Sequence, residues 1–122
     1  MRPGGLAALP AALLVAVSPA LAQERVPAQR QALVDLARIL GESHAIRQAC
    51  EGPQDQYWRK RMQQLLAVEA ADQSLKTRIS VAFNAGYGSG KALYPSCTDA
   101  ARAEARRIAR TAQGLSEALA KP

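Results

Sequence analysis

The densest group of chemically capable residues is the consecutive run Glu42-Ser43-His44. A carboxylate, a hydroxyl and an imidazole are the groups of a hydrolase triad. Successive residues of a helix point about 100° apart, so three neighbours cannot form such a triad by themselves. An enzyme site that uses His44, Glu42, Ser43 and further polar groups in a cleft remains an alternative.

His44 is the only histidine of the chain. A zinc site needs several ligands, so we predict no metal site. Leu33, Ala37, Leu40 and His44 recur at helical spacing, which places His44 at the edge of an apolar helical face. We expect a structural histidine with a hydrogen-bond partner.

Residues 85–91, A-G-Y-G-S-G-K, superficially resemble a phosphate-binding loop. The Ser or Thr that would hold magnesium after the lysine is replaced by Ala92, and no strand precedes the loop. We therefore predict no nucleotide and no other cofactor. Gly86 and Gly90 lie on the apolar stripe of the predicted helix, and Gly41 lies inside the first helix, so we expect these three glycines to mark a close helix crossing.

The elements that position these residues follow an export signal. Arg2 precedes an apolar run, Leu6 to Val17, which is too short to span a bilayer, and Ala20-Leu21-Ala22 has the small residues of a cleavage site. We predict cleavage after Ala22 and a periplasmic or secreted protein without a transmembrane segment. Residues 23–122 would form a single helical domain, and cleavage lowers the formal charge from +6 to +5.

The predicted export determines how we interpret the two cysteines, Cys50 and Cys97. In an oxidising compartment two cysteines usually form one disulfide. Free, functional thiols are the alternative. No C-x-x-C motif is present, so neither a redox motif nor a haem attachment site is predicted.

Apolar periodicity and capping residues divide the chain into four helices. The first runs from Pro27 or Ala28 to about residue 49, where Gly52 and Pro53 end it. The second runs from about residue 54 or 55, with Asp55 as its cap, to residue 69. Asp72 should cap the third helix.

The third helix ends at Pro95, and the fourth begins near Ser96 or Thr98, where S-C-T-D fits a capping box. Short connections make successive helices antiparallel, so Cys50 and Cys97 meet at one end. The sequence therefore predicts an all-α fold: a small four-helix up-down bundle with one disulfide.

Two basic groups lie on these helices: Arg59-Lys60-Arg61, and the four arginines Arg102, Arg106, Arg107 and Arg110. A solvated helical face explains them most simply. The functional interpretation is attraction to an anionic envelope component or to an acidic protein partner. Nucleic acid is disfavoured by the predicted location.

The segments G-E-S-H (41–44), C-E-G-P (50–53), Y-W-R (57–59) and F-N-A-G-Y (83–87) resemble a family of short exported bacterial proteins of unknown function. The resemblance implies a periplasmic setting and brings no activity, cofactor or partner. It marks candidate functional positions beside the structural ones: Glu42, Ser43, His44, Arg47, Tyr57, Trp58, Arg59, Asn84, Gly86 and Tyr87.

Two functions follow from these patterns. The favoured one is a non-enzymatic periplasmic binding or accessory protein of the bacterial cell envelope. The other is the small periplasmic enzyme with a site around His44. An open pocket at His44, with a carboxylate or hydroxyl in reach, would favour the enzyme. The sequence specifies neither a ligand nor an oligomeric state.

Overall fold

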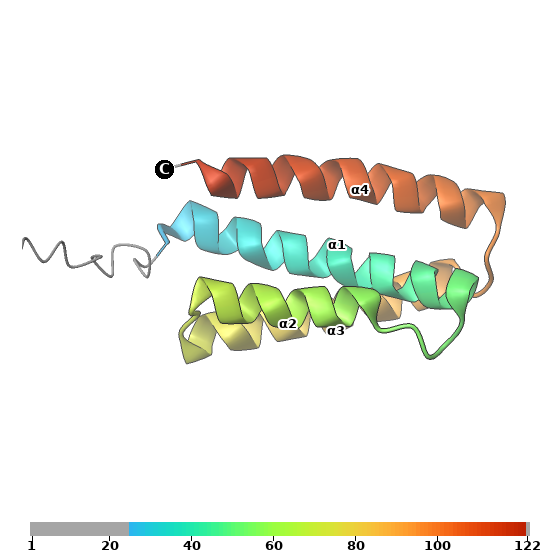
Figure 1. Cartoon of the computed structure of the whole chain (residues 1–122), viewed down its shortest axis with the longest axis horizontal. Helices are drawn as coiled ribbons and strands as arrows, with labels where there is room; N and C mark the ends of the chain where they lie inside the picture. Colours follow the sequence, from blue (N-terminus) through green and yellow to red (C-terminus); the bar gives the residue numbers. More distant parts are fainter. Residues whose placement is uncertain (1–24, 122) are drawn as a thin grey trace, which may run out of the picture.

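The computed structural model describes residues 25–121, which form four helices and, within that range, no strand. The helices are α1 (Pro27–Glu51), α2 (Tyr57–Glu69), α3 (Gln73–Leu93) and α4 (Asp99–Ala120), and they run alternately up and down (Figure 1). The predicted all-α bundle is confirmed. The predicted signal peptide and the apolar run within it lie outside the described residues.

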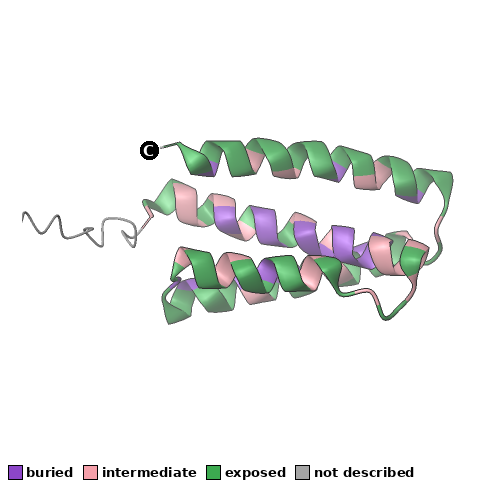
Figure 2. Ribbon diagram, in the orientation of Figure 1, coloured by how far each residue is buried: buried purple, intermediate pink, exposed green. Residues whose placement is uncertain are grey.

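Helix α1 lies at the centre of the bundle, with α4 on one side and the pair α2 and α3 on the other (Figure 1). Its apolar stripe supplies the largest share of the core, and buried residues follow its length in Figure 2. On α2, Met62 is the one buried residue. All four helices and the α2–α3 connection contribute to the main core cluster: Leu33, Leu36, Ala37, Leu40, Met62, Ala71, Leu75, Ile79, Ala82, Phe83 and Leu119.

Glycines hold α1 and α3 close together along a glycine seam formed by Gly41, Gly86 and Gly90. A Cβ atom at Gly41 would overlap the carbonyl oxygen of Phe83, and one at Gly86 would overlap the carbonyl oxygen of Arg38. A Cβ at Gly90 would lie 2.8 Å from that of Ala45. The expectation that these glycines mark a close helix crossing is therefore confirmed.

The predicted start of α2 is wrong by two or three residues, and the fourth helix starts at the second of its two predicted positions, Thr98, without the predicted capping box. Helix α2 begins at Tyr57, because Asp55 accepts the backbone N–H of Tyr57 at 3.0 Å within the connection instead of capping a helix directly. Helix α4 is capped by Thr98, whose hydroxyl accepts the N–H of Ala101 at 3.0 Å, so the capping box at Ser96 does not form. Asp72 caps α3 as predicted.

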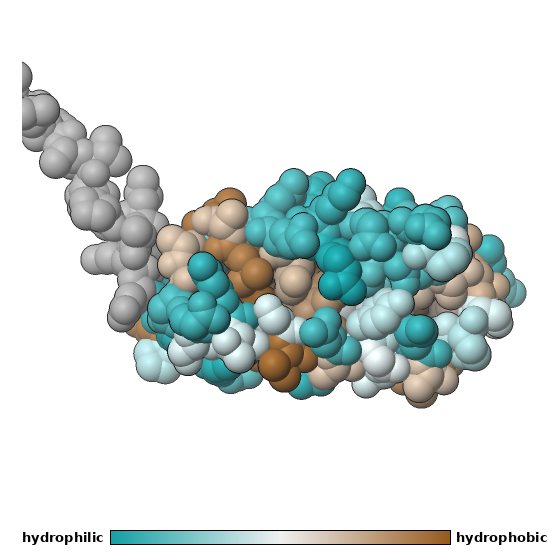
Figure 3. Space-filling view, turned by 90° about the horizontal axis from the view of Figure 1, so that it is seen from below, coloured by the Kyte–Doolittle hydropathy of each residue, from teal (hydrophilic) through white to brown (hydrophobic). Residues whose placement is uncertain are grey.

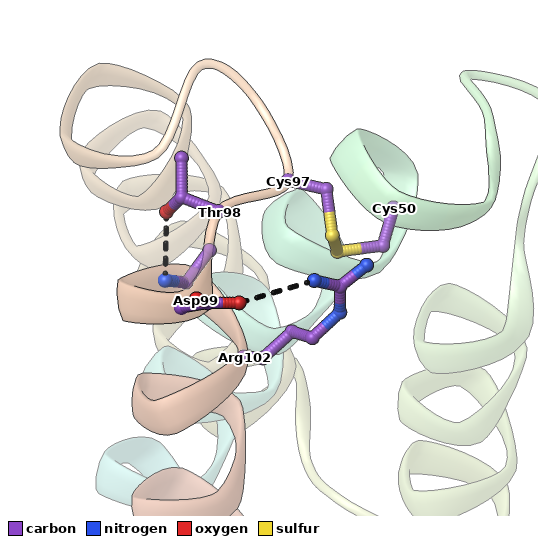
Figure 4. The surroundings of a disulfide bond; sticks show 6 residues. Cys50, Cys97, Thr98, Asp99 and Arg102 are labelled. Atoms are coloured by element: carbon purple, nitrogen blue, oxygen red, sulfur yellow. Dashed lines mark hydrogen bonds and ion pairs between the residues drawn. A yellow bond between two sulfur atoms is a disulfide. The ribbon is translucent and has the colours of Figure 1, made fainter.

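Cys50 and Cys97 form the predicted disulfide, with their α-carbons 4.7 Å apart (Figure 4). It joins the end of α1 to the residue before the cap of α4, across 47 positions of sequence. For a closed loop of this size the chain-entropy model gives about 4 kcal/mol of stabilisation. The bond therefore anchors the start of α4 to the central helix.

Arg25 joins three elements at the opposite end of the bundle. Its Nε and Nη2 donate to the carboxylate of Glu69, at 2.6 and 2.9 Å, where α2 ends. Its Nη1 donates to the carbonyl of Leu119 in the last turn of α4, at 2.8 Å. The disulfide and Arg25 thus tie α4 to the rest of the bundle at its two ends.

Candidate functional site

The structure does not bring Glu42, Ser43 and His44 together into one site. Glu42 lies toward α4, where burial and the nearby carboxylate of Glu104 raise its pKa. Ser43 lies on the side of α1 between α2 and α4. His44 lies in the core between α2 and α3. Helical geometry therefore separates the three groups, as the sequence argument expected.

His44 is fully buried, and neither of its ring nitrogens has a hydrogen-bond partner among residues 25–121. The expected partner is thus missing. The imidazole packs against the rings of Phe83 and Tyr87, at centroid distances of 5.6 and 5.0 Å. Burial lowers the pKa of His44, the cation of Arg59 lowers it further, and Asp55 opposes the change. His44 is therefore a neutral core residue that solvent does not reach.

Tyr87 lies beside His44 and continues toward the surface. Its hydroxyl donates to Gln48 at 2.5 Å, and the ammonium group of Lys91 lies 5.4 Å from the centre of its ring. These residues border a cavity of about 270 Å³ between the ends of α1 and α3. The two other marked positions on α3 differ: Asn84 is exposed, and Gly86 belongs to the glycine seam.

A second cavity of about 270 Å³ lies over α1 between α2 and α4, and we call it the α2–α4 groove. Its floor is α1, one wall carries Trp58 of α2, and the other wall is α4. It is lined by Leu40, Ser43, Ile46, Arg47, Cys50, Glu51, Trp58, Arg102, Ala105, Ala109 and Ala112. Three of the marked positions, Ser43, Arg47 and Trp58, therefore meet in one concave site.

The α2–α4 groove is apolar at one end and charged at the other. Helix α4 begins beside the disulfide and runs back along α1 (Figure 1), so Arg102 and Glu51 line the groove near the disulfide, and Ala112 and Leu40 line the end away from it. Figure 4 shows the side chain of Arg102 extending from α4 toward Cys50. A ligand in the groove would therefore meet methyl groups at one end and guanidinium groups at the other.

Trp58 belongs to a cluster of aromatic and cationic side chains at the mouth of the groove. Tyr57 packs edge-on against Trp58 at 4.9 Å. The guanidinium groups of Arg47 and Arg61 lie 4.7 and 5.2 Å from the centre of the Tyr57 ring. Asp55 accepts from Nε of Arg47 at 2.9 Å. Tyr, Trp and Arg are the residues most enriched in binding hot spots.

The predicted basic groups do not form one continuous patch. Arg59 is half-buried and lies 5.4 Å from the Phe83 ring centre, on the α3 side, whereas Arg61 lies at the groove mouth. On α4, Arg107 is paired with Glu104. Seen from the side of α2 and α3, the surface is largely hydrophilic, with a hydrophobic band toward the α2–α3 turn (Figure 3). That face resembles an ordinary solvated helical surface.

Comparison with known protein families shows which family the chain belongs to. Residues 28–122 match the family described as protein of unknown function DUF2385. The chain belongs to the DUF2385 family. No curated protein and no solved structure matches it.

For this DUF2385 protein, the described part of the chain holds no helix long and apolar enough to cross a membrane. Nor do residues 25–121 hold a group of three or more His, Cys, Asp or Glu side chains placed to bind a metal ion. The chemistry available in the α2–α4 groove is thus apolar contact together with hydrogen bonding and charge from arginine.

Sequence reasoning missed much of the groove lining in this DUF2385 protein. Ala105 and Ala112 fit the apolar spacing of α4, which places them on its core-facing side, whereas Ala109 does not fit that spacing. In the structure these alanines are half-buried or exposed, because a methyl group is too short to fill the space above α1. The signal was the repeated small residue at positions 105, 109 and 112 of one helix.

Proposed function

We propose that this DUF2385 protein is a non-enzymatic binding protein of the bacterial cell envelope and that the α2–α4 groove is its binding site. The observation that carries the proposal is the meeting of Ser43, Arg47 and Trp58 in one apolar cavity with arginines at one end. Concave, mostly apolar sites with a few polar groups are where proteins bind ligands.

The positions of the polar groups argue against the alternative of an enzyme around His44. A general base must come within about 3 Å of the proton that it removes. His44 is fully buried, and Glu42 and Ser43 lie on other sides of α1. The groove itself contains one hydroxyl and one carboxylate, Ser43 and Glu51, but no imidazole.

The periplasmic setting of this proposal rests on the predicted export signal and is compatible with the disulfide. Disulfides persist in oxidising compartments and are rare in reducing ones. The Cys50–Cys97 bond borders the groove, because Cys50 is one of its lining residues. Export would bring the groove into contact with anionic envelope components and acidic envelope proteins.

Selective retention of envelope components tests the proposed function. Immobilised protein would be incubated with fractionated envelope extract, and the retained molecules would be compared with those retained by Ala109→Phe, which fills the groove. Ala103→Phe is the matched control, because Ala103 is also exposed on α4 but does not line the groove. We expect wild type and Ala103→Phe to retain a component that Ala109→Phe loses. Equal retention by all three proteins would contradict the proposal.

A further inference from the structure

We propose that the α2–α4 groove binds a single-chain amphiphile with an anionic head, of the fatty-acid carboxylate type. The head would lie at Arg102 and Arg47, and the alkyl chain would extend toward Leu40 and Ala112. This inference rests on the proposed function, because it names the ligand of the same groove. Three observations carry it: the volume of the groove, the order of its lining residues and the N–H donors that its arginines keep available.

The volume of about 270 Å³ favours an alkyl chain over a protein helix. One turn of an α-helix, with a radius of about 5 Å and a length of about 5.4 Å, occupies roughly 400 Å³. A helix could therefore lie on the groove but not in it. An alkyl chain has water-sized units, and at about 30 Å³ for each unit the groove holds roughly nine of them.

The order of the lining residues matches one anionic end and one apolar end. From the disulfide inward, the α4 wall reads Arg102, Ala105, Ala109 and Ala112. The α1 floor changes in the same direction from Glu51 and Arg47 to Leu40. A uniformly polar ligand such as a free sugar would leave the alanine end unmatched, and a purely apolar ligand would leave the arginines without an acceptor.

The arginines at the charged end retain donors for a carboxylate. Arg102 approaches Asp99 at only 3.6 Å, and both side chains are largely exposed. The hydrogen bond that Arg47 makes to Asp55 uses Nε. A guanidinium group has five N–H donors and pairs well with a carboxylate.

The charged end also contains a carboxylate that opposes an anionic head. Glu51 lines the groove and is exposed, whereas Asp55 accepts a hydrogen bond from Arg47 and Asp99 forms a long ion pair with Arg102. An anionic ligand should therefore bind more tightly when Glu51 is neutral. This expectation separates an anionic ligand from a cationic one, which Glu51 would attract.

Titration with decanoate, below the concentration at which it forms micelles, tests the inference. Trp58 is the only tryptophan of the chain and lies in the groove, so its fluorescence reports directly on occupancy. With protein expressed from the full chain, we expect a saturable change in emission. Affinity should rise by up to about fourfold for each methylene added from hexanoate to decanoate.

Variants and ligand controls distinguish the parts of the inference. Ala109→Phe should abolish the saturable change, and Ala103→Phe should leave it intact. Arg102→Gln should weaken decanoate binding about threefold to tenfold, as expected for partly exposed charges, whereas Arg110→Gln on the outer part of α4 should not. Glu51→Gln should tighten binding about twofold to threefold. Decylammonium should bind more weakly than decanoate.

Three results would overturn the inference: no saturable response to decanoate, equal or tighter binding of decylammonium, or undiminished decanoate binding by Ala109→Phe. If the groove retains a different envelope component in the extract experiment but rejects decanoate, the proposed function stands and the amphiphile inference fails. If the retained component is a protein, the occupant is a partner surface instead of an alkyl chain.

Discussion

Helix α1 meets α3 and α4 in two different ways. Against α3, the glycine seam removes side chains so that the two backbones come into contact. Against α4, contact depends on the smaller cluster of Ile46, Ala101 and Ile108, the Cys50–Cys97 bond and the Arg25 interactions at the far end. The α3 side is thus held by close backbone packing, whereas the α4 side is held by a few buried apolar side chains and by links at its two ends, and leaves a groove beside them.

This difference teaches that small residues have opposite effects on the two sides of α1. Glycine on α1 and α3 lets the helices approach until the space between them is filled. Alanine on α4, at positions 105, 109 and 112, lines a space that neither Trp58 nor Leu40 fills. In this molecule the helices pack closely where both α1 and α3 carry small residues, and a cavity remains where the small residues of α4 face no side chain large enough to fill the space.

Loss of the disulfide should have the largest effect on stability. Cys97→Ala should lower the free energy of unfolding by about 4 kcal/mol, because a 47-residue connection is released in the unfolded state. Cys50→Ala should cost nearly the same, and the double variant little more, because each removes the same bond. Denaturant unfolding of the unreduced proteins measures this. Strongly additive losses would mean that the cysteines act separately.

The glycine seam should be the next most sensitive feature. Gly86→Ala should destabilise by about 3 kcal/mol, at the upper end for overpacking, because its Cβ meets the backbone of α1 and not a movable side chain. Gly88→Ala, two residues along the same helix and in open space, should stabilise by about 0.5–1 kcal/mol. Thermal unfolding of the two variants compares them, and a similar sign of effect in both would refute the close approach.

Replacement of His44 should have a smaller effect that depends on pH. Since burial lowers the pKa of His44 in the folded protein, the unfolded chain takes up the proton first as pH falls. Wild type should therefore lose stability below pH 6.5, while above that value this contribution is absent. His44→Leu should not show this loss of stability at low pH. At neutral pH it should be about 1 kcal/mol more stable than wild type, because it removes two buried nitrogens that lack a hydrogen-bond partner. Parallel pH dependence in both proteins would contradict the buried, neutral imidazole.

Loss of the Arg25 interactions should give the smallest change. Arg25→Ala removes the bonds to Glu69 and to the carbonyl of Leu119, for about 0.5–1 kcal/mol. Hydrogen exchange should quicken in the last turn of α4, whereas Lys76→Ala, at an exposed position on α3, should leave exchange there unchanged. Unaltered protection of Leu119 in Arg25→Ala would show that this end of α4 is held by packing alone.

The sequence predicted the parts of the molecule that follow local rules. Apolar periodicity found the four helices, and the antiparallel order placed Cys50 beside Cys97. The glycines at 41, 86 and 90 correctly marked the tight helix crossing. The errors at Asp55 and Ser96 arose because several capping residues lie close together, and only their three-dimensional contacts select one of them.

The candidate site was less predictable because a groove is the space that the side chains of neighbouring helices leave unfilled. Ser43, Arg47 and Trp58 were marked by resemblance, but nothing in their spacing showed that they face one groove. Glu51 completes it from the end of α1, and Arg102 and Ala109 come from α4, which is distant in sequence. The pattern of one helix indicates which of its faces is apolar. The volume left between helices depends instead on the side chains of all the neighbouring helices together.

The most direct test of the binding site is a backbone NMR titration of the protein with decanoate. Saturable shift changes should gather at the amides of Ser43, Trp58 and Ala109 and leave the glycine seam at Gly41 and Gly86 unchanged. The second cavity, beside Tyr87 and Lys91, serves as an internal comparison because it has the same volume of about 270 Å³. Changes centred on Tyr87 and Lys91, or no saturable changes at the groove, would contradict the assignment of the binding site to the α2–α4 groove.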